Sequence, residues 1–333
     1  MSFLVSIEPS GHTFEADPSR SILDGALLEG FLLKHSCRKG TCGSCKGQVL
    51  SGEVDHGDSP FDVLSLAERE GGLALFCCAK ARSALVIDAP EVTEFRGISV
   101  QQIAGRVASI DKVSDDVAIL RLMLPPEHNF RYLPGQYVQV LLKNGQRRSY
   151  SMATSVLRDN QLEWHVRYMP NGIFSGHVFN ELKPRELLRL EGPFGSFFLR
   201  ASDRPMVLLA SGTGFAPIQA LLEQLTGNGN RRPVYLYWGG RRRSDLYRHA
   251  ELLEMEQTLA WFHYTPVLSR PSPACDWLGA TGFVHKQVMK DFASLRDFEV
   301  YACGAPIVVD SARTDYINER ALEPNCFFAD AFV

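Results

Sequence analysis

The stretch Cys37-Arg38-Lys39-Gly40-Thr41-Cys42-Gly43-Ser44-Cys45 decides the fold of the first part of this chain. Its cysteines have the spacing C-x4-C-x2-C, and further cysteines follow near residue 77. This spacing is typical of a 2Fe–2S cluster held by four thiolates. Gly40 and Gly43 let the backbone wrap closely, so that its N–H groups point at the negatively charged cluster. The sequence therefore predicts an iron–sulfur site with the ligands Cys37, Cys42, Cys45 and Cys77.

A zinc site and a different fourth ligand are the alternatives to this interpretation. Structural zinc sites usually present two closely spaced cysteine pairs, whereas this loop contains one C-x2-C pair. Cys78 stands beside Cys77 and is an equally placed thiol; we choose Cys77 and expect Cys78 to be a small buried residue. The chain has 8 cysteines in 333 residues, too few for a disulfide scaffold.

The overall composition is that of an ordinary globular protein, with 45% apolar and 22% charged residues. Its 35 basic and 38 acidic side chains nearly balance, which argues against a nucleic-acid binder with a basic surface. No segment reaches the ~18 apolar residues that a membrane span needs. The N-terminus lacks the features of a secretory signal, so we expect a cytoplasmic protein that binds neither nucleic acid nor membrane.

Local patterns predict three domains, over residues 1–92, 98–200 and 204–333, with a linker near 89–97. The first should be an α+β domain. It has a hairpin of Phe3–Ile7 and His12–Glu15, a helix capped by Ser21, and a second helix opened by a capping box from Ser65 to Glu68.

The other two domains differ in their periodicity. Residues 105–200 alternate with period two, for example in Val117–Leu124 and Leu162–Tyr168, which predicts an antiparallel β-barrel. From Met206 onward strands alternate with helices that begin at Pro217, Val284 and Ile307. This alternation predicts an α/β domain with a parallel sheet and helices on both of its faces. Residues 93–200 carry 14 basic and 10 acidic side chains, a balance that suits an anionic ligand in the middle domain.

Two glycine-containing stretches predict phosphate binding. Gly172-Ile173-Phe174-Ser175 stands at a predicted helix start, where backbone N–H groups suit a pyrophosphate. Gly212-Thr213-Gly214-Phe215-Ala216-Pro217 follows an apolar strand and opens a helix. A dinucleotide fingerprint would have a third glycine where Pro217 stands, so the match to the standard pattern is partial.

Taken together, these segments resemble the ferredoxin–NADP reductase superfamily, here preceded by a plant-type ferredoxin domain. The residues that carry the likeness are SCRKGTCGSCK, Arg148-Ser149-Tyr150-Ser151, His165-Val166-Arg167, the two glycine stretches, Trp238-Gly239-Gly240-Arg241, Cys303-Gly304-Ala305-Pro306 and Phe328-Ala329-Asp330-Ala331-Phe332. This domain order is found in reductases that serve Rieske-type and diiron oxygenases. The chain in particular resembles the CDP-6-deoxy-3,4-glucoseen reductases of dideoxy-sugar biosynthesis.

The resemblance implies roles for individual residues. Arg148 would pair with a flavin phosphate, Tyr150 would stack on the isoalloxazine, and Ser151 would hydrogen-bond near its N5. Cys303 would lie beside the nicotinamide, and Phe332 would shield the flavin. The remaining implied contacts are Ser149, His165, Val166, Arg167, Gly172, Ile173, Phe174 and Ser175 for the flavin, and Gly212, Thr213, Gly214, Pro217, Gly239, Arg241, Gly304 and Pro306 for the nucleotide.

The function that the resemblance implies is electron transfer from NADH through FAD and one 2Fe–2S cluster to a partner protein. FAD is favoured over FMN by the N-terminal position of the ferredoxin domain. NADH is favoured over NADPH, although Arg241-Arg242-Arg243 could bind the 2′-phosphate of NADPH. A flavin reductase without a protein acceptor and a redox sensor are the alternatives of other classes.

The acceptor is implied as a pyridoxamine-phosphate-dependent dehydrase, with an oxygenase component as the alternative. We expect the reductase to be a monomer. A docking patch of Lys34, Arg38, Lys39 and Lys46 is expected beside the cluster loop.

Overall fold

The computed structural model of the protein describes residues 2–36, 38–89, 98–155, 160–272 and 275–332. The chain divides into two compact units. The first runs to Gln101 and includes Gly192–Ser196, and the second comprises Gln102–Glu191 and Phe197–Phe332. The predicted linker lies almost wholly outside the described residues, and the three predicted domain bounds stay a prediction. Among the described residues, no helix is both long and apolar enough to cross a membrane.

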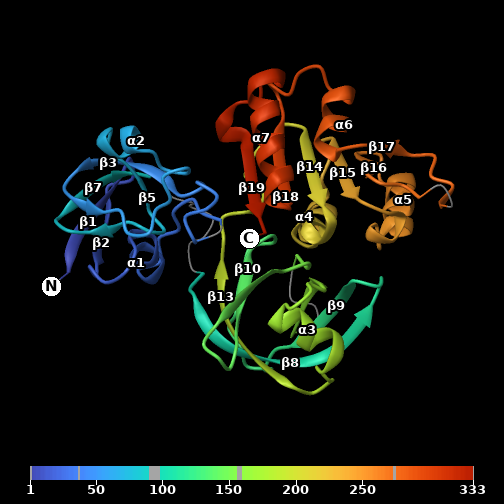
Figure 1. Ribbon diagram of the computed structural model, residues 1–333, viewed down its shortest axis with the longest axis horizontal. Helices are drawn as coiled ribbons and strands as arrows, with labels where there is room; N and C mark the ends of the chain where they lie inside the picture. Colours follow the sequence, from blue (N-terminus) through green and yellow to red (C-terminus); the bar gives the residue numbers. More distant parts are fainter. Residues whose placement is uncertain (1, 37, 90–97, 156–159, 273–274, 333) are drawn as a thin grey trace. The chain divides into compact units, whose positions relative to one another are not determined.

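The first unit is built on a mixed five-stranded sheet in the order β2-β1-β7-β3-β5. β1 pairs with β7 in parallel and with β2 in antiparallel fashion (Figure 1). The strands are β1 Phe3–Glu8, β2 His12–Ala16, β3 Lys46–Ser51, β5 Leu73–Leu75 and β7 Leu85–Asp88, with a small ladder of β4 Val54–Asp55 and β6 Lys80–Ala81. This α+β arrangement confirms the predicted class of the first domain.

Two capped helices stand before and after the cysteine loop in the sequence, α1 Ile22–Leu28 and α2 Leu66–Glu70. The Ser21 hydroxyl accepts a hydrogen bond from the Asp24 N–H at 3.1 Å, and α1 buries Ile22 and Leu23 in the core. At α2 the Ser65 N–H donates to the Glu68 carboxylate at 2.8 Å, and the reciprocal bond completes a capping box. Both predicted caps are confirmed.

The part of the second unit predicted to bind flavin, called the flavin half below, is built on a six-stranded sheet in the order β11-β10-β13-β8-β9-β12. β9 pairs in antiparallel fashion with β8 and β12, and β10 does so with β11, as period two predicted. Trp164 is fully buried in its core. The elements are β8 Gln101–Lys112, β9 Val117–Met123, β10 Tyr137–Leu141, β11 Arg147–Ser151, β12 Gln161–Arg167, α3 Ile173–Asn180 and β13 Leu187–Phe194.

The part of the second unit predicted to bind the nucleotide, called the nucleotide half below, is built on a parallel six-stranded sheet in the order β17-β16-β15-β14-β18-β19 (Figure 1). One apolar layer packs α4 and α5 against it, and a second layer packs α6 and α7. Strands therefore carry helices on both faces, as predicted. The elements are β14 Met206–Ser211, α4 Phe215–Gly227, β15 Val234–Gly240, α5 His249–Thr258, β16 Phe262–Leu268, β17 Ala280–Thr281, α6 Val284–Asp291, β18 Glu299–Gly304, α7 Pro306–Arg320 and β19 Phe327–Ala331.

Candidate functional site

The cysteine loop is built around glycines that leave room for sulfur. Gly40 and Gly43 both have positive φ, at 78° and 69°, a region that favours glycine. A Cβ on Gly40 would stand 2.7 Å from the Cys78 Sγ. The loop backbone at Gly40 therefore packs against the Cys78 thiol more closely than a side chain at this position would permit.

The other predicted ligands lie near this loop. Cys45 packs with Leu64 and Leu75, and Cys77 and Cys78 pack against this group. Cys78 is half-buried like Cys77, so the expectation that it is buried was wrong. The two neighbouring Sγ atoms are 3.7 Å apart. Cys37 lies outside the described residues, and within the described ranges no three His, Cys, Asp or Glu side chains form a metal-binding group. The ligand set Cys37, Cys42, Cys45 and Cys77 thus stays a prediction.

The start of the loop is anchored within the first unit by His35. Its backbone N–H donates to the Ser196 Oγ at 2.9 Å, and its Nε2 accepts the Gly195 N–H at 3.0 Å. Burial lowers the pKa of His35 to about 4, so the ring is neutral at pH 7 and its Nδ1 donates to the Leu33 carbonyl. The segment Gly192–Ser196 therefore fixes the backbone that leads into the cysteines.

The predicted docking patch carries less unpaired charge than the sequence indicates. The Arg38 guanidinium forms an ion pair with Asp24 and lies 4.1 Å over the Phe194 ring. The Lys46 ammonium pairs with Glu68 at 2.7 Å. These two cations are compensated inside the unit, and exposed Lys34 and Lys39 are the members of the patch that reach solvent most.

The predicted flavin motif lies at the end of β11. The Tyr150 ring stacks on Trp164, with centroids 5.5 Å apart, and packs against Phe174. Burial raises the pKa of Tyr150, so its hydroxyl remains a donor. The half-buried Arg148 guanidinium donates to the Gln146 side chain and the Arg147 carbonyl. This arrangement holds an aromatic ring in place beside a cation, and it fits a planar, phosphorylated ligand.

The second phosphate candidate is the start of α3. Gly172 caps this helix, and a Cβ there would stand 2.4 Å from the Ser175 Oγ. The Ser175 hydroxyl accepts the Met169 N–H at 3.1 Å, which closes the turn. Ile173 is exposed and Phe174 is buried in the barrel core. The first-turn N–H groups of this helix are suited to an anion.

The backbone of the predicted dinucleotide loop, Gly212–Gly214, packs directly against the backbone at the end of β18. A Cβ on Gly214 would stand 2.3 Å from the Cys303 carbonyl oxygen, and one on Gly304 would stand 2.6 Å from the Ser211 carbonyl oxygen. The Phe332 N–H donates to the Gly304 carbonyl at 2.9 Å. The structure thus brings together the glycine loop predicted for the dinucleotide, Cys303 and Gly304 predicted beside the nicotinamide, and Phe332 predicted to shield the flavin.

A buried carboxylate in this region was not predicted. The Ser151 hydroxyl donates to Asp330 at 3.1 Å, and Asp330 is adjacent to Cys303 in the β18–β19 ladder. Burial, followed by the charge of Asp330, raises the pKa of the Cys303 thiol, which is therefore neutral. A charged residue at an inward position of an apolar terminal strand was the available signal for Asp330.

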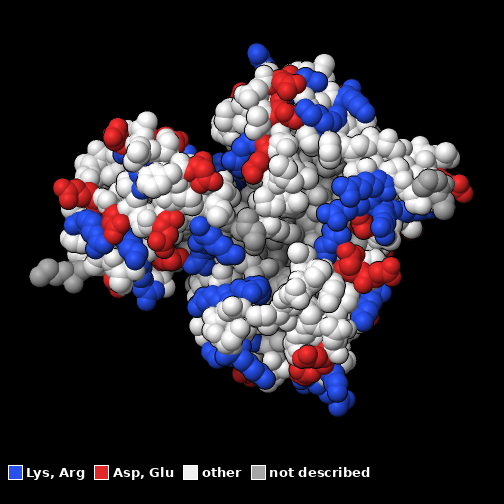
Figure 2. Space-filling view, in the orientation of Figure 1, with Lys and Arg blue, Asp and Glu red and all other residues white. Residues whose placement is uncertain are grey.

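A second carboxylate lies at the end of β15. Asp245 accepts the Arg241 N–H at 2.6 Å and the Arg242 N–H at 3.2 Å, and so orders the turn that carries the three arginines. Their side chains are exposed, and Figure 2 shows basic side chains gathered over this part of the nucleotide half. The sequence offered no acidic residue directly at the strand end, and Asp245 reaches it through a short 3-10 turn.

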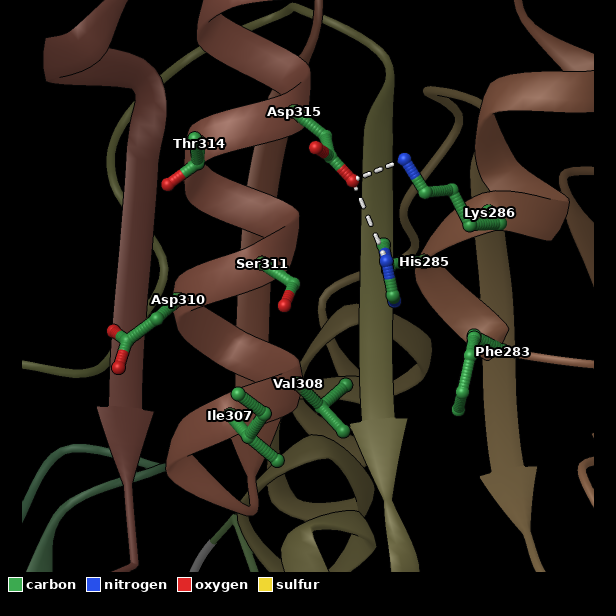
Figure 3. Close-up of a pocket in the computed structure, with 9 residues that line it drawn as sticks. All are labelled: Phe283, His285, Lys286, Ile307, Val308, Asp310, Ser311, Thr314 and Asp315. Atoms are coloured by element: carbon green, nitrogen blue, oxygen red, sulfur yellow. Dashed lines mark ion pairs between the residues drawn. The ribbon is translucent and has the colours of Figure 1, made fainter.

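A cavity of about 550 Å³ lies between α6 and α7. Exposed Phe283 and Ile307, which follow β17 and β18, line one end of it (Figure 3). Farther along, Asp315 from α7 pairs with Lys286 at 2.7 Å and with His285 at 3.4 Å. Ligands of parallel α/β sheets bind at the carboxyl ends of strands, so this cavity adjoins the predicted nucleotide site. The sequence alone assigned no role to the residues that line this cavity.

Comparisons with known proteins cover the whole chain. Residues 5–82 match the family described as 2Fe-2S iron-sulfur cluster binding domain, residues 104–199 the oxidoreductase FAD-binding domain, and residues 208–314 the oxidoreductase NAD-binding domain. The chain is 42% identical over 335 residues to the CDP-6-deoxy-L-threo-D-glycero-4-hexulose-3-dehydrase reductase of Yersinia pseudotuberculosis, covering 100% of this chain and 99% of that protein.

Two further relatives extend the likeness to oxygenase systems. The reductase component of phenol 2-monooxygenase from a Pseudomonas species is 33% identical, with 98% of this chain and 94% of that protein covered. The crystal structure of an Amycolatopsis cytochrome P450 reductase superposes with a TM-score of 0.83 at 32% identity and covers 99% of this chain and 98% of that one.

Proposed function

The chain belongs to the iron–sulfur flavoprotein reductases of the ferredoxin–NADP reductase superfamily, and from this premise we propose that its electron acceptor is a pyridoxamine-phosphate-dependent sugar dehydrase. At the level of the family, the protein is an NADH-dependent oxidoreductase that carries FAD and a 2Fe–2S cluster and reduces a partner protein. When bound, the two cofactors convert hydride from NADH into single electrons. The chain's own residues bind and orient them.

One observation carries the choice of acceptor. Identity to the Yersinia dehydrase reductase is 42% over the full length, against 33% to the phenol 2-monooxygenase component. An oxygenase component is the second candidate, because several relatives with full-length coverage serve monooxygenases or dioxygenases.

The acceptor is tested by reconstitution of the purified holoprotein with NADH. We expect deoxygenated sugar product when the reductase is mixed with a CDP-6-deoxy-hexulose 3-dehydrase and its substrate. Little or no hydroxylation should follow when it is mixed with a phenol hydroxylase oxygenase component and phenol. Efficient hydroxylation without sugar turnover would assign the protein to the oxygenase systems instead.

We infer the following roles for the residues of the second unit. Tyr150, fixed against Trp164, presents a face to the isoalloxazine, and Arg148 neutralises flavin phosphate together with the start of α3 at Gly172–Ser175. Ser151 presents its hydroxyl near the flavin N5, oriented by Asp330. The neutral Cys303 thiol contacts the nicotinamide, and Phe332 covers the flavin.

The remaining length of the dinucleotide follows the carboxyl edge of the sheet. Gly212–Gly214 would receive the pyrophosphate, and the cavity between Phe283 and Ile307 is suited to the adenosine end, because an exposed aromatic ring can stack on a base. A reducing cytoplasm suits the thiolate ligands of the cluster, and a monomer remains our expectation.

NADH should be preferred over NADPH. The Asp245 carboxylate stands at the end of β15, where it holds the Arg241–Arg243 turn and would repel a 2′-phosphate. We expect kcat/KM to be higher for NADH than for NADPH in a ferricyanide assay. Replacement of Asp245 by Asn should bring the two kcat/KM values closer together. A wild-type preference for NADPH would show that the three exposed arginines dominate the site.

A further inference from the structure

A buried polar network joins the flavin barrel to the nucleotide sheet within the second unit. His165 lies on β12, and its Nδ1 is 2.8 Å from the Tyr247 hydroxyl, which comes from the turn before α5. Its Nε2 is 3.2 Å from the Glu163 carboxylate. His165 is 5% exposed, so these groups meet away from bulk water.

The protonation states of these groups determine which of them donates each hydrogen bond. Burial lowers the pKa of His165 although Glu163 opposes this, so the ring is neutral. Burial raises the pKa of Tyr247, so its hydroxyl keeps its proton. Tyr247 therefore donates to Nδ1, and the Nε2–H donates to Glu163.

Glu163 is held as an anion by groups from three other elements. Arg121 on β9 donates to it at 2.8 Å, Gln219 on α4 at 3.2 Å, and Arg248 lies 3.9 Å away. Burial raises the pKa of Glu163, but the hydrogen bond from His165 and the charge of Arg121 outweigh it and hold the pKa below its usual range. The carboxylate is thus a fixed acceptor that orients the His165 ring.

Tyr247 also contacts a residue that holds the dinucleotide loop. Its ring packs edge-on against Trp238 at 5.1 Å, and Trp238 stacks on Phe215 at 4.1 Å. The Trp238 indole N–H donates to the Gly212 carbonyl at 2.9 Å, and Phe215 directly follows Gly214. A continuous set of contacts therefore runs from the barrel strand to both ends of the loop.

We propose that His165 and Tyr247 form a positioning pair that fixes the Gly212–Gly214 loop against the flavin barrel for hydride transfer. Neither side chain needs to touch a reacting atom. Hydride transfer depends steeply on the distance and angle between donor and acceptor, and a displacement of about 1 Å can cost about 100-fold in rate. The pair acts by holding the two binding halves at one separation. This inference rests on the proposed assignment of the loop to the dinucleotide.

The test is Tyr247→Phe, which removes the hydroxyl and keeps the ring against Trp238. We expect anaerobic flavin reduction by NADH to slow about tenfold at saturating NADH, because the loop is displaced relative to the barrel. The dissociation constant for NAD⁺, followed by tryptophan fluorescence, should change less than about threefold, because the Tyr247 hydroxyl is bonded to His165 and does not bind the nucleotide. Electron transfer from the reduced flavin to the cluster should keep its rate.

Tyr264→Phe is the matched control. The Tyr264 hydroxyl lies 3.2 Å from the His249 Nδ1, so it is the same kind of bond, but it joins β16 to α5 on one side of the nucleotide sheet. Both variants should lower the unfolding midpoint by roughly 2–4 °C, and this control should leave flavin reduction unchanged. In unfolding of the apoprotein, a double-mutant cycle of Tyr247→Phe with His165→Leu should show coupling.

Equal slowing in the two variants, or unchanged flavin reduction in Tyr247→Phe, would overturn the proposal and leave the pair a stabilising contact. The loop assignment is tested separately by Gly214→Ala. If that variant reduces its flavin normally, the assignment fails; if it is slow while Tyr247→Phe is not, only the positioning pair fails.

Discussion

Replacement of Cys42 by Ser is expected to abolish NADH-driven reduction of cytochrome c while ferricyanide reduction survives. Cys42 is the central thiol of the C-x4-C-x2-C loop, and loss of one thiolate from a four-thiolate cluster destabilises it. Ferricyanide can take electrons at the flavin, whereas one-electron protein acceptors depend on the cluster. The measurement is the ratio of the two activities in protein of known flavin and iron content.

Cys78→Ser is the matched control for this variant. Cys78 lies beside Cys77, and its Sγ faces the Gly40 backbone, but we assign the fourth ligand to Cys77. The Cys78 variant should keep its iron, its visible cluster spectrum and its cytochrome c activity. Loss of the cluster in Cys78→Ser with retention in Cys77→Ser would reverse the ligand assignment. Equal loss of cytochrome c and ferricyanide activity in Cys42→Ser would contradict the electron route.

Replacement of Gly214 by Ala is expected to reduce the rate of flavin reduction by NADH by about 100-fold. The added Cβ would stand 2.3 Å from the Cys303 carbonyl oxygen and 2.6 Å from the Gly304 Cα. Both are backbone atoms, so the loop must move away from the strand that carries Cys303. Stopped-flow absorbance of the flavin after anaerobic mixing with NADH measures the effect.

Gly227→Ala is the control for the glycine substitution. Gly227 is exposed at the end of the same helix, and a Cβ there has no heavy atom within 4 Å apart from its own helix backbone and chain neighbours. This change should leave flavin reduction unaltered. Chemical reduction of the Gly214→Ala protein with dithionite should still reduce both cofactors. A normal rate in Gly214→Ala would show that NADH does not use this loop.

The elements that the sequence predicted accurately are those fixed by local chemistry. Ser21 and Ser65 cap helices through bonds to residues three positions away, and alternating side chains define β9 and β12. Helix α4 begins at Phe215 rather than Pro217, because proline is tolerated within the first turn of a helix. Helix α5 was missed, because Leu252 is the residue it buries and its other positions show little apolar periodicity.

The candidate site was predictable where a motif is contiguous and unpredictable where it depends on distant contacts. The Ser151–Asp330 bond joins residues 179 positions apart, and the His165–Tyr247 bond joins residues 82 positions apart. No spacing rule relates such residues, because the fold alone brings them together. His165 was predicted as a flavin contact, and the structure places its side chain in the network with Glu163 and Tyr247.

The central claim is that electrons enter at the flavin and leave through the cluster. It is tested most directly by mixing the holoprotein anaerobically with NADH and recording time-resolved spectra of both cofactors. The flavin absorbance should bleach first, and the cluster absorbance should fall afterwards with a separate rate. Cluster reduction that precedes flavin reduction, or that persists at its normal rate after the flavin is removed, would contradict this account.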